Sequence, residues 1–149
     1  MRKIKVLLII AMMGLWMSQA FSAESTWMTN FDKAKKVAAE KKIPIIMDFS
    51  GSDWCIWCQR LDKEIFSKKK FQEYVKDNFV LVLIDFPRAG NQTPEEKKLN
   101  RALSEKYKVA GFPTVLILDA NGKKLGQAGY MPGGPDAFIK FLEKYKVKK

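Results

Sequence analysis

Two short apolar runs limit most strongly what this chain can fold into. Residues 45–49 read IIMDF and residues 79–86 read FVLVLIDF, and β-branched or aromatic side chains dominate both runs. Runs of this length and composition are typical of strands that are buried on both faces of a sheet. Such strands need a covering layer on each side, so we expect one sheet with helices above and below it.

The remaining segments supply those helices and two further strands. Apolar residues at helical spacing predict helices over residues 30–41, 55–75 (with a break near 68), 93–107 and 135–145. The Asn121-Gly122 pair predicts a hairpin turn between strands at residues 115–119 and 124–130. The predicted fold class is therefore α/β, with one central sheet flanked by helices on both faces.

The first 23 residues have the pattern of a secretory signal peptide. A basic start is followed by an unbroken run of twelve apolar residues, 6–17, and then by small residues that allow cleavage after Ala20 or Ala23. A membrane span needs roughly 20 apolar residues, so this run is too short for one. We expect a signal peptide over 1–23 and one folded domain over 24–149. The mature protein should not span a membrane and should be periplasmic or secreted.

The net charge of +11 raises the question of a nucleic-acid partner. The lysines are scattered, with clusters only at residues 68–70 and in the tail after residue 140, which is typical of solvated helix faces. No nucleic-acid-binding motif accompanies them, so we expect no nucleic-acid partner.

Only two cysteines, Cys55 and Cys58, occur in the chain, and there is no histidine. A structural crosslink, a metal clip and a redox couple are the three uses to consider. A disulfide across so short a loop restrains the unfolded chain little, which argues against a purely structural bridge. Tetrahedral zinc usually takes four Cys or His ligands, which this chain lacks, so we expect no metal cofactor. Transfer of Cu(I) by the two thiolates stays open as an alternative.

A redox couple fits the spacing of the pair best. Residues three apart share one face of a helix, and the start of that helix favours the thiolate of Cys55. Cys58 lies one turn further in, where we expect it to be more buried. Cys55 would then attack a substrate disulfide, and Cys58 would attack Cys55 to release the product.

Four features together resemble the thioredoxin-fold superfamily, and in particular its exported members. They are the motif Trp54-Cys55-x-x-Cys58 after a strand, Asp48 on that strand, the segment Gly111-Phe112-Pro113-Thr114, and the glycines Gly122 and Gly129 in and after the last hairpin. The resemblance covers about residues 27–146. It implies a thioredoxin fold with a central mixed sheet, and the activity of a protein disulfide oxidoreductase.

The resemblance also implies roles for individual residues. Asp48 would be a buried carboxylic acid beneath Cys58 that relays protons, its pKa raised by burial, although an aspartate turned to solvent at the strand end is an alternative. Pro113 would follow a cis peptide bond and leave the backbone of Phe112 free to pair with an extended substrate. An ordinary proline at the start of a strand is the competing interpretation.

The tryptophans of the motif complete the predicted site. Trp54 would shield the cysteines, while Ile56 and Trp57 depart from the dipeptides of ordinary thioredoxins and suggest an apolar surface for partners. Core packing is the alternative for both tryptophans. The turn before the motif is one residue longer than in thioredoxin, and its Asp53 would place a negative charge near Cys55.

We therefore expect an exported thiol–disulfide oxidoreductase that reduces or isomerises protein disulfides. Its catalytic residues would be Cys55, Cys58 and Asp48, with Trp54, Ile56, Trp57, Phe112 and Pro113 binding substrate. It would need no cofactor, act as a monomer and depend on a redox partner that the sequence does not identify. Two alternatives stay open: a binding module or chaperone without essential redox activity, and a dithiol carrier of Cu(I).

Overall fold

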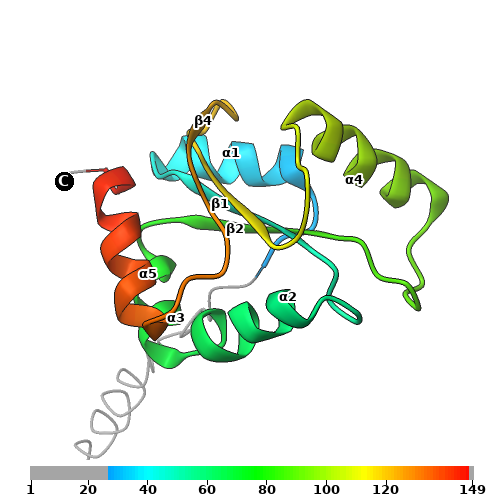
Figure 1. The fold of residues 1–149 in the computed structure, drawn as a ribbon. Coiled ribbons are helices and arrows are strands. Elements are labelled where there is room, and N and C mark those ends of the chain that lie inside the picture. The colour runs from blue at the N-terminus through cyan, green and yellow to red at the C-terminus, as the bar shows by residue number, and fades with distance from the viewer. Residues whose placement is uncertain (1–26, 148–149) are drawn as a thin grey trace, which may run out of the picture.

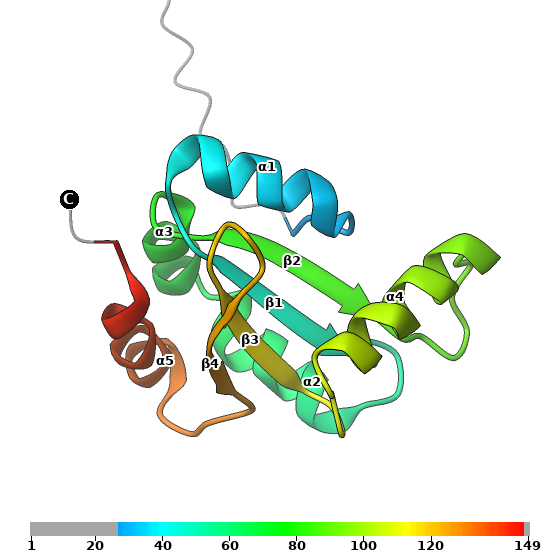
Figure 2. The ribbon, with the colours of Figure 1, turned by 90° about the horizontal axis from the view of Figure 1, so that it is seen from above.

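A mixed four-stranded sheet forms the centre of the protein, as predicted. The computed structural model describes residues 27–147, and its strands lie in the order β2-β1-β3-β4 (Figure 2). β1 pairs parallel with β2 and antiparallel with β3, and β3 pairs antiparallel with β4. The strands are β1 (Ile45–Ser50), β2 (Val80–Asp85), β3 (Thr114–Leu118) and β4 (Lys124–Ala128).

Helices cover both faces of this sheet, which confirms the predicted α/β class. One face carries α1 (Phe31–Lys41) and α4 (Pro94–Lys106) (Figure 1). The other face carries α2 (Ile56–Leu61), the π-helical segment η1 (Asp62–Phe66), α3 (Lys69–Lys76) and α5 (Gly134–Leu142), which runs into the 3-10 turn η2 (Glu143–Tyr145). Within residues 27–147 no helix is both long and apolar enough to cross a membrane. The predicted signal peptide lies outside the described residues.

The alternation of side chains along β1 creates two separate cores. Ile45, Met47 and Phe49 point to the side of α1 and α4, where they join Phe31 in one apolar cluster. Ile46 points to the opposite side and joins the cluster formed with η1, α3 and α5. Successive residues of a strand face opposite ways, so Asp48 shares the face of Ile46, under α2 and η1.

The break predicted near residue 68 is present, because Ser67 and Lys68 separate η1 from α3. The π-helical form of η1, where the amide of Ser67 bonds the carbonyl of Asp62 at 2.8 Å, and the end of the last strand were not predicted. The last strand, expected to reach residue 130, ends at Ala128. After Ala128, the Tyr130 hydroxyl donates a hydrogen bond to the side chain of Glu64 in η1 at 2.6 Å.

The packing of α5 on this face gives a stability prediction. Phe138 is fully buried and lies edge-on against Phe66 and Phe71, with ring centroids at 5.5 and 6.0 Å. Phe138→Ala should lower the free energy of unfolding by about 3–5 kcal/mol, because it leaves a cavity in a close-packed core. Leu99→Ala, at a leucine that is 60% exposed on α4, is the control and should cost far less in urea unfolding. Equal losses in the two variants would contradict this account of the core.

Candidate active site

The two cysteines form a disulfide at the start of α2. Cys55 is the residue that caps the helix, Cys58 lies in its first turn, and their Cα atoms are 5.2 Å apart. The backbone amide of Cys58 donates to the sulfur of Cys55 at 3.2 Å. Free amides at a helix start favour an anion, so the same geometry would stabilise a thiolate on Cys55 in the reduced protein.

The difference in exposure between the two cysteines is smaller than the sequence predicted. Cys55 is 7% exposed and Cys58 is 4% exposed, so both are buried in the disulfide form. Each sulfur covers part of the other when they are bonded. The environments nevertheless differ in kind, because Cys55 occupies the capping position and Cys58 lines a partly open pocket with Asp48.

Asp48 is buried beneath Cys58, which rules out the solvent-facing alternative. It is 5% exposed, and its Oδ1 atom finds no hydrogen-bond partner among the described residues. Its neighbours across the sheet are Leu83 on β2 and Val115 on β3, so neither adjacent strand offers it a cation. Burial raises the pKa of Asp48 to about 8, and the negative charges of Asp62 and Asp85 act in the same direction.

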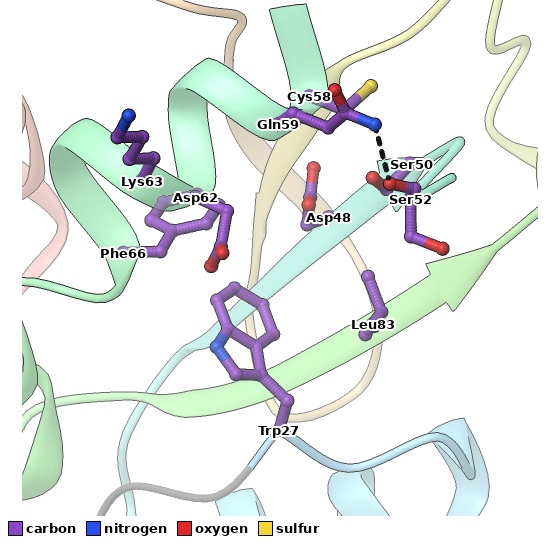
Figure 3. Close-up of a pocket in the computed structure, with 10 residues that line it drawn as sticks. All are labelled: Trp27, Asp48, Ser50, Ser52, Cys58, Gln59, Asp62, Lys63, Phe66 and Leu83. Atoms are coloured by element: carbon purple, nitrogen blue, oxygen red, sulfur yellow. Dashed lines mark hydrogen bonds between the residues drawn. The ribbon is translucent and has the colours of Figure 1, made fainter. Parts of the chain in front are cut away.

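A partly open pocket of about 500 Å³ joins Asp48 to Cys58. Figure 3 shows the carboxyl group of Asp48 pointing from β1 toward the helix that carries Cys58. Trp27 and Phe66 form an apolar wall, with ring centroids 5.0 Å apart, while Asp62 and Lys63 supply polar groups. The full lining is Trp27, Asp48, Ser50, Ser52, Cys58, Gln59, Asp62, Lys63, Phe66 and Leu83. This pocket gives the Asp48 carboxyl group a place to exchange protons beside Cys58.

The turn before Cys55 is tied to the end of β2. Ser52 donates its amide and its hydroxyl to the carboxylate of Asp85, at 3.0 and 2.6 Å. The carboxylate of Asp53 accepts hydrogen bonds from the amides of Arg88 and Ala89, the shorter of them 2.7 Å, and these bonds lower the pKa of Asp53. The extra residue of the turn is thus used for anchoring, and the Asp53 carboxylate is engaged by backbone amides of the neighbouring loop.

Phe112 and Pro113 lie on the same side of the site as Trp54. The peptide bond between Phe112 and Pro113 is cis, as the resemblance implied. The Trp54 ring meets Phe112 edge-on with centroids 6.0 Å apart, and Phe112 in turn stacks on Phe86 at 5.0 Å. The indole nitrogen of Trp54 donates to the carbonyl of Phe86 at 2.8 Å. Trp54 is therefore held by contacts with two loops.

Trp57 has its own set of supporting residues. Its ring lies 5.2 Å from that of Tyr130, and the guanidinium of Arg60 lies over both rings, at 5.2 and 5.0 Å. Arg60 is paired with Glu64 at 2.9 Å. The three apolar residues of the motif remain accessible, with exposed fractions of 38% for Trp54, 64% for Ile56 and 49% for Trp57. This accessibility excludes core packing as the reason for the two tryptophans.

Sequence reasoning missed most of the pocket lining and the residues that support the two tryptophans. Trp27 lines the pocket, Tyr130 and Arg60 support Trp57, and Arg88 lies over Trp54 at 4.5 Å. Tyr130 and Trp27 lie far from the cysteine motif in the sequence, and no pattern of spacing links them to it. Arg60 at helical spacing from Trp57 was the one signal available.

Comparison with known proteins places this arrangement in a family. Residues 31–146 match the thioredoxin-like domain family. The chain is 31% identical over 126 residues to the disulfide bond reductase DsbH of Chlamydia pneumoniae, covering 85% of this chain and 76% of that protein. A solved structure of a DsbH oxidoreductase is 30% identical, has a TM-score of 0.78, and matches over 89% of this chain and 93% of that one.

A further relative shares only the domain. The thioredoxin-related protein DsbJ of Chlamydia pneumoniae is 26% identical over 103 residues, which are 69% of this chain but 30% of DsbJ. The chain described here belongs to the thioredoxin-like domain family. Its fold and its Cys55–Cys58 pair define a thiol–disulfide oxidoreductase.

The burial of Asp48 predicts how stability depends on pH. An aspartate in an unfolded chain has a pKa of about 3.9, whereas Asp48 in the folded protein has a pKa of about 8. Between these values the folded state holds a proton that the unfolded state releases, so the free energy of unfolding falls as the pH rises. Asp48→Asn removes this contribution.

Urea unfolding of the oxidised wild type and Asp48→Asn at a series of pH values measures it. The wild type should lose stability relative to the variant from about pH 4 to about pH 8, and the difference should then level off. A difference that stays constant over this range would show that Asp48 is ionised in the folded protein at neutral pH.

Proposed function

We propose that this protein is exported and reduces or isomerises disulfides of other proteins through Cys55, Cys58 and Asp48. The observation that carries the proposal is a disulfide at a helix start whose Cys58 shares a pocket with the buried Asp48. The Oδ1 atom of Asp48 has no hydrogen-bond partner among the described residues. The name of the similar DsbH, a disulfide bond reductase, supports the direction of the reaction. Export rests on the signal-peptide pattern of residues 1–23.

The reaction begins with the reduced protein. The Cys55 thiolate attacks one sulfur of a substrate disulfide, which forms a mixed disulfide and releases the first substrate thiol. The Cys58 thiolate then attacks the sulfur of Cys55, which breaks the mixed disulfide and releases the second thiol. The substrate has gained two electrons, and the protein is left with the Cys55–Cys58 disulfide. A dithiol protein must reduce this disulfide again before the next turnover.

Asp48 supplies the proton transfer that the second step needs. Cys58 must lose a proton before it can attack, and the neighbouring Asp48 is the group placed to accept it once its own proton has left through the pocket. The pKa of Asp48, about 8, lies close to that of an ordinary thiol, about 8.5, so the transfer costs little free energy. Asp48, protonated by Cys58, can then release this proton through the partly open pocket.

The exposed apolar residues around Cys55 would bind the substrate. Trp54, Ile56 and Trp57 offer a surface for a partner, and the backbone of Phe112 beside the cis bond is available for pairing with an extended chain. The same surface would serve a binding module. The Cu(I) alternative rests on the two cysteines alone, since the described residues hold no cluster of three or more His, Cys, Asp or Glu side chains suited to a metal.

Variants of the two cysteines separate the enzyme from the binding module. The wild type should reduce insulin in the presence of dithiothreitol, and Cys55→Ser should fall to the background rate. Cys58→Ser should accumulate a mixed disulfide with a substrate, because the step that releases the product is missing. Non-reducing electrophoresis and mass spectrometry would detect the adduct on Cys55. Unchanged partner binding by Cys55→Ser, together with wild-type protein inert toward insulin, would favour the binding module.

The redox potential tests the proposed direction. The chain has no histidine that could add to the helix start in stabilising a thiolate on Cys55, so the pair should equilibrate with glutathione as a reductant does. We expect a potential within about 50 mV of the thioredoxin value of about −270 mV. A value near that of a strong periplasmic oxidase, about −120 mV, would contradict the assignment as a reductase.

A further inference from the structure

We propose that Arg88 makes this oxidoreductase selective for disulfides that have an acidic side chain within about three residues of the attacked cysteine. The inference rests on the proposed function, because it names the substrates that the Cys55 site prefers. Arg88 would be a specificity residue that touches the substrate without taking part in the exchange of sulfur bonds.

The position of Arg88 places a cation over the exposed ring of Trp54 in the active-site motif. Arg88 is exposed on the loop after β2, and its Cζ atom lies 4.5 Å from the centre of the Trp54 ring, within the range of a cation–π contact. Trp54 directly precedes Cys55 and meets Phe112 edge-on. A chain that reaches Cys55 along the Phe112 side would therefore pass the guanidinium.

The loop that carries Arg88 is fixed in place. The amide of Arg88 donates to both carboxylate oxygens of Asp53, at 3.0 and 3.1 Å, and the amide of Ala89 adds a third bond. Trp54 is itself bonded to the carbonyl of Phe86, two residues before Arg88. Because backbone and ring are both held, the guanidinium loses little conformational freedom when a substrate carboxylate pairs with it.

The guanidinium of Arg88 can pair with an incoming carboxylate, whereas that of Arg60 is already paired. On the other side of Cys55, Arg60 lies over Trp57 but already pairs with Glu64 at 2.9 Å. Among residues 27–147 no ion pair is formed by the guanidinium of Arg88. The nearby Asp53 carboxylate acts on it through space, but both Asp53 oxygens are taken up by backbone amides. The planar guanidinium of Arg88 can thus receive an incoming carboxylate.

The test compares disulfide peptides that differ at one position. Each peptide carries a fluorophore and a quencher across one disulfide, with Glu, Gln or Lys placed in turn at each of the three positions on either side of the cysteine. Because exposed ion pairs are weak, the wild type should show kcat/KM values roughly two- to fivefold higher for Glu than for Gln at the best position, and lower again for Lys. In 0.5 M NaCl this preference should shrink.

Variants then assign the preference to one residue. Arg88→Gln should bring the ratio of Glu to Lys peptides close to one, Arg88→Glu should invert it, and Arg88→Lys should retain part of it. Arg101→Gln is the matched control, since Arg101 lies on α4 and bonds the carbonyl of Lys97, and it should keep the wild-type ratio. Thermal unfolding checks that each variant is folded. If Arg88→Gln is not folded, the Arg88→Lys variant and the salt series test the role of Arg88 instead.

The outcomes separate this inference from the function on which it rests. A wild type that reduces all the peptides at equal rates, or an Arg88→Gln variant that keeps the preference, overturns the role of Arg88 and leaves the oxidoreductase standing. A similar loss of preference in Arg101→Gln would assign the effect to net charge and also overturn the inference. A wild type that reduces neither the peptides nor insulin refutes the proposed function itself.

Discussion

The burial of β1 between two neighbouring strands is the constraint on which the site depends. β1 pairs with β2 and β3 and is covered by helices on both faces, so every one of its side chains is buried. Asp48 is part of that strand and therefore shares an apolar environment in which the ionised form is costly. Burial raises the pKa of Asp48 to about 8, so its carboxyl group is mostly neutral at neutral pH. This pKa also suits Asp48 to proton transfer with the neighbouring Cys58.

The other half of the site is built from loops that converge on the start of α2. The turn of Ser52 and Asp53 is bonded to the chain that leaves β2, and the cis-proline segment before β3 reaches the same region through Phe112 and Trp54. Cys55 thus lies between a rigid backbone and an accessible apolar surface. Such an arrangement suits a group that must meet large partners while its own resolving cysteine stays in a protected pocket.

Patterns within short stretches of sequence were sufficient to predict the α/β class, whereas the thioredoxin fold was implied by the resemblance. The apolar runs predicted β1 and β2, and the helix predicted over residues 93–107 is α4, which begins with a full capping box at Thr93. The cysteine spacing led to Cys55 and Cys58, and the resemblance implied the burial of Asp48. The contacts of Arg88 with Trp54 and of Tyr130 with Trp57 could not be predicted. The partners are 34 and 73 residues apart in the sequence and meet only after folding. The near-equal burial of the two cysteines could not be predicted from their positions in the helix either, because it depends on the disulfide itself.

The most direct test of the account asks which sulfur reacts first in the reduced protein. Brief treatment with a limiting amount of iodoacetamide, followed by digestion and mass spectrometry, identifies the cysteine that carries a single label. The account predicts that Cys55 carries most of it, because the helix-start amides favour its thiolate while Cys58 keeps its proton beside Asp48. Equal labelling, or label mainly on Cys58, would contradict the division of roles between the two cysteines.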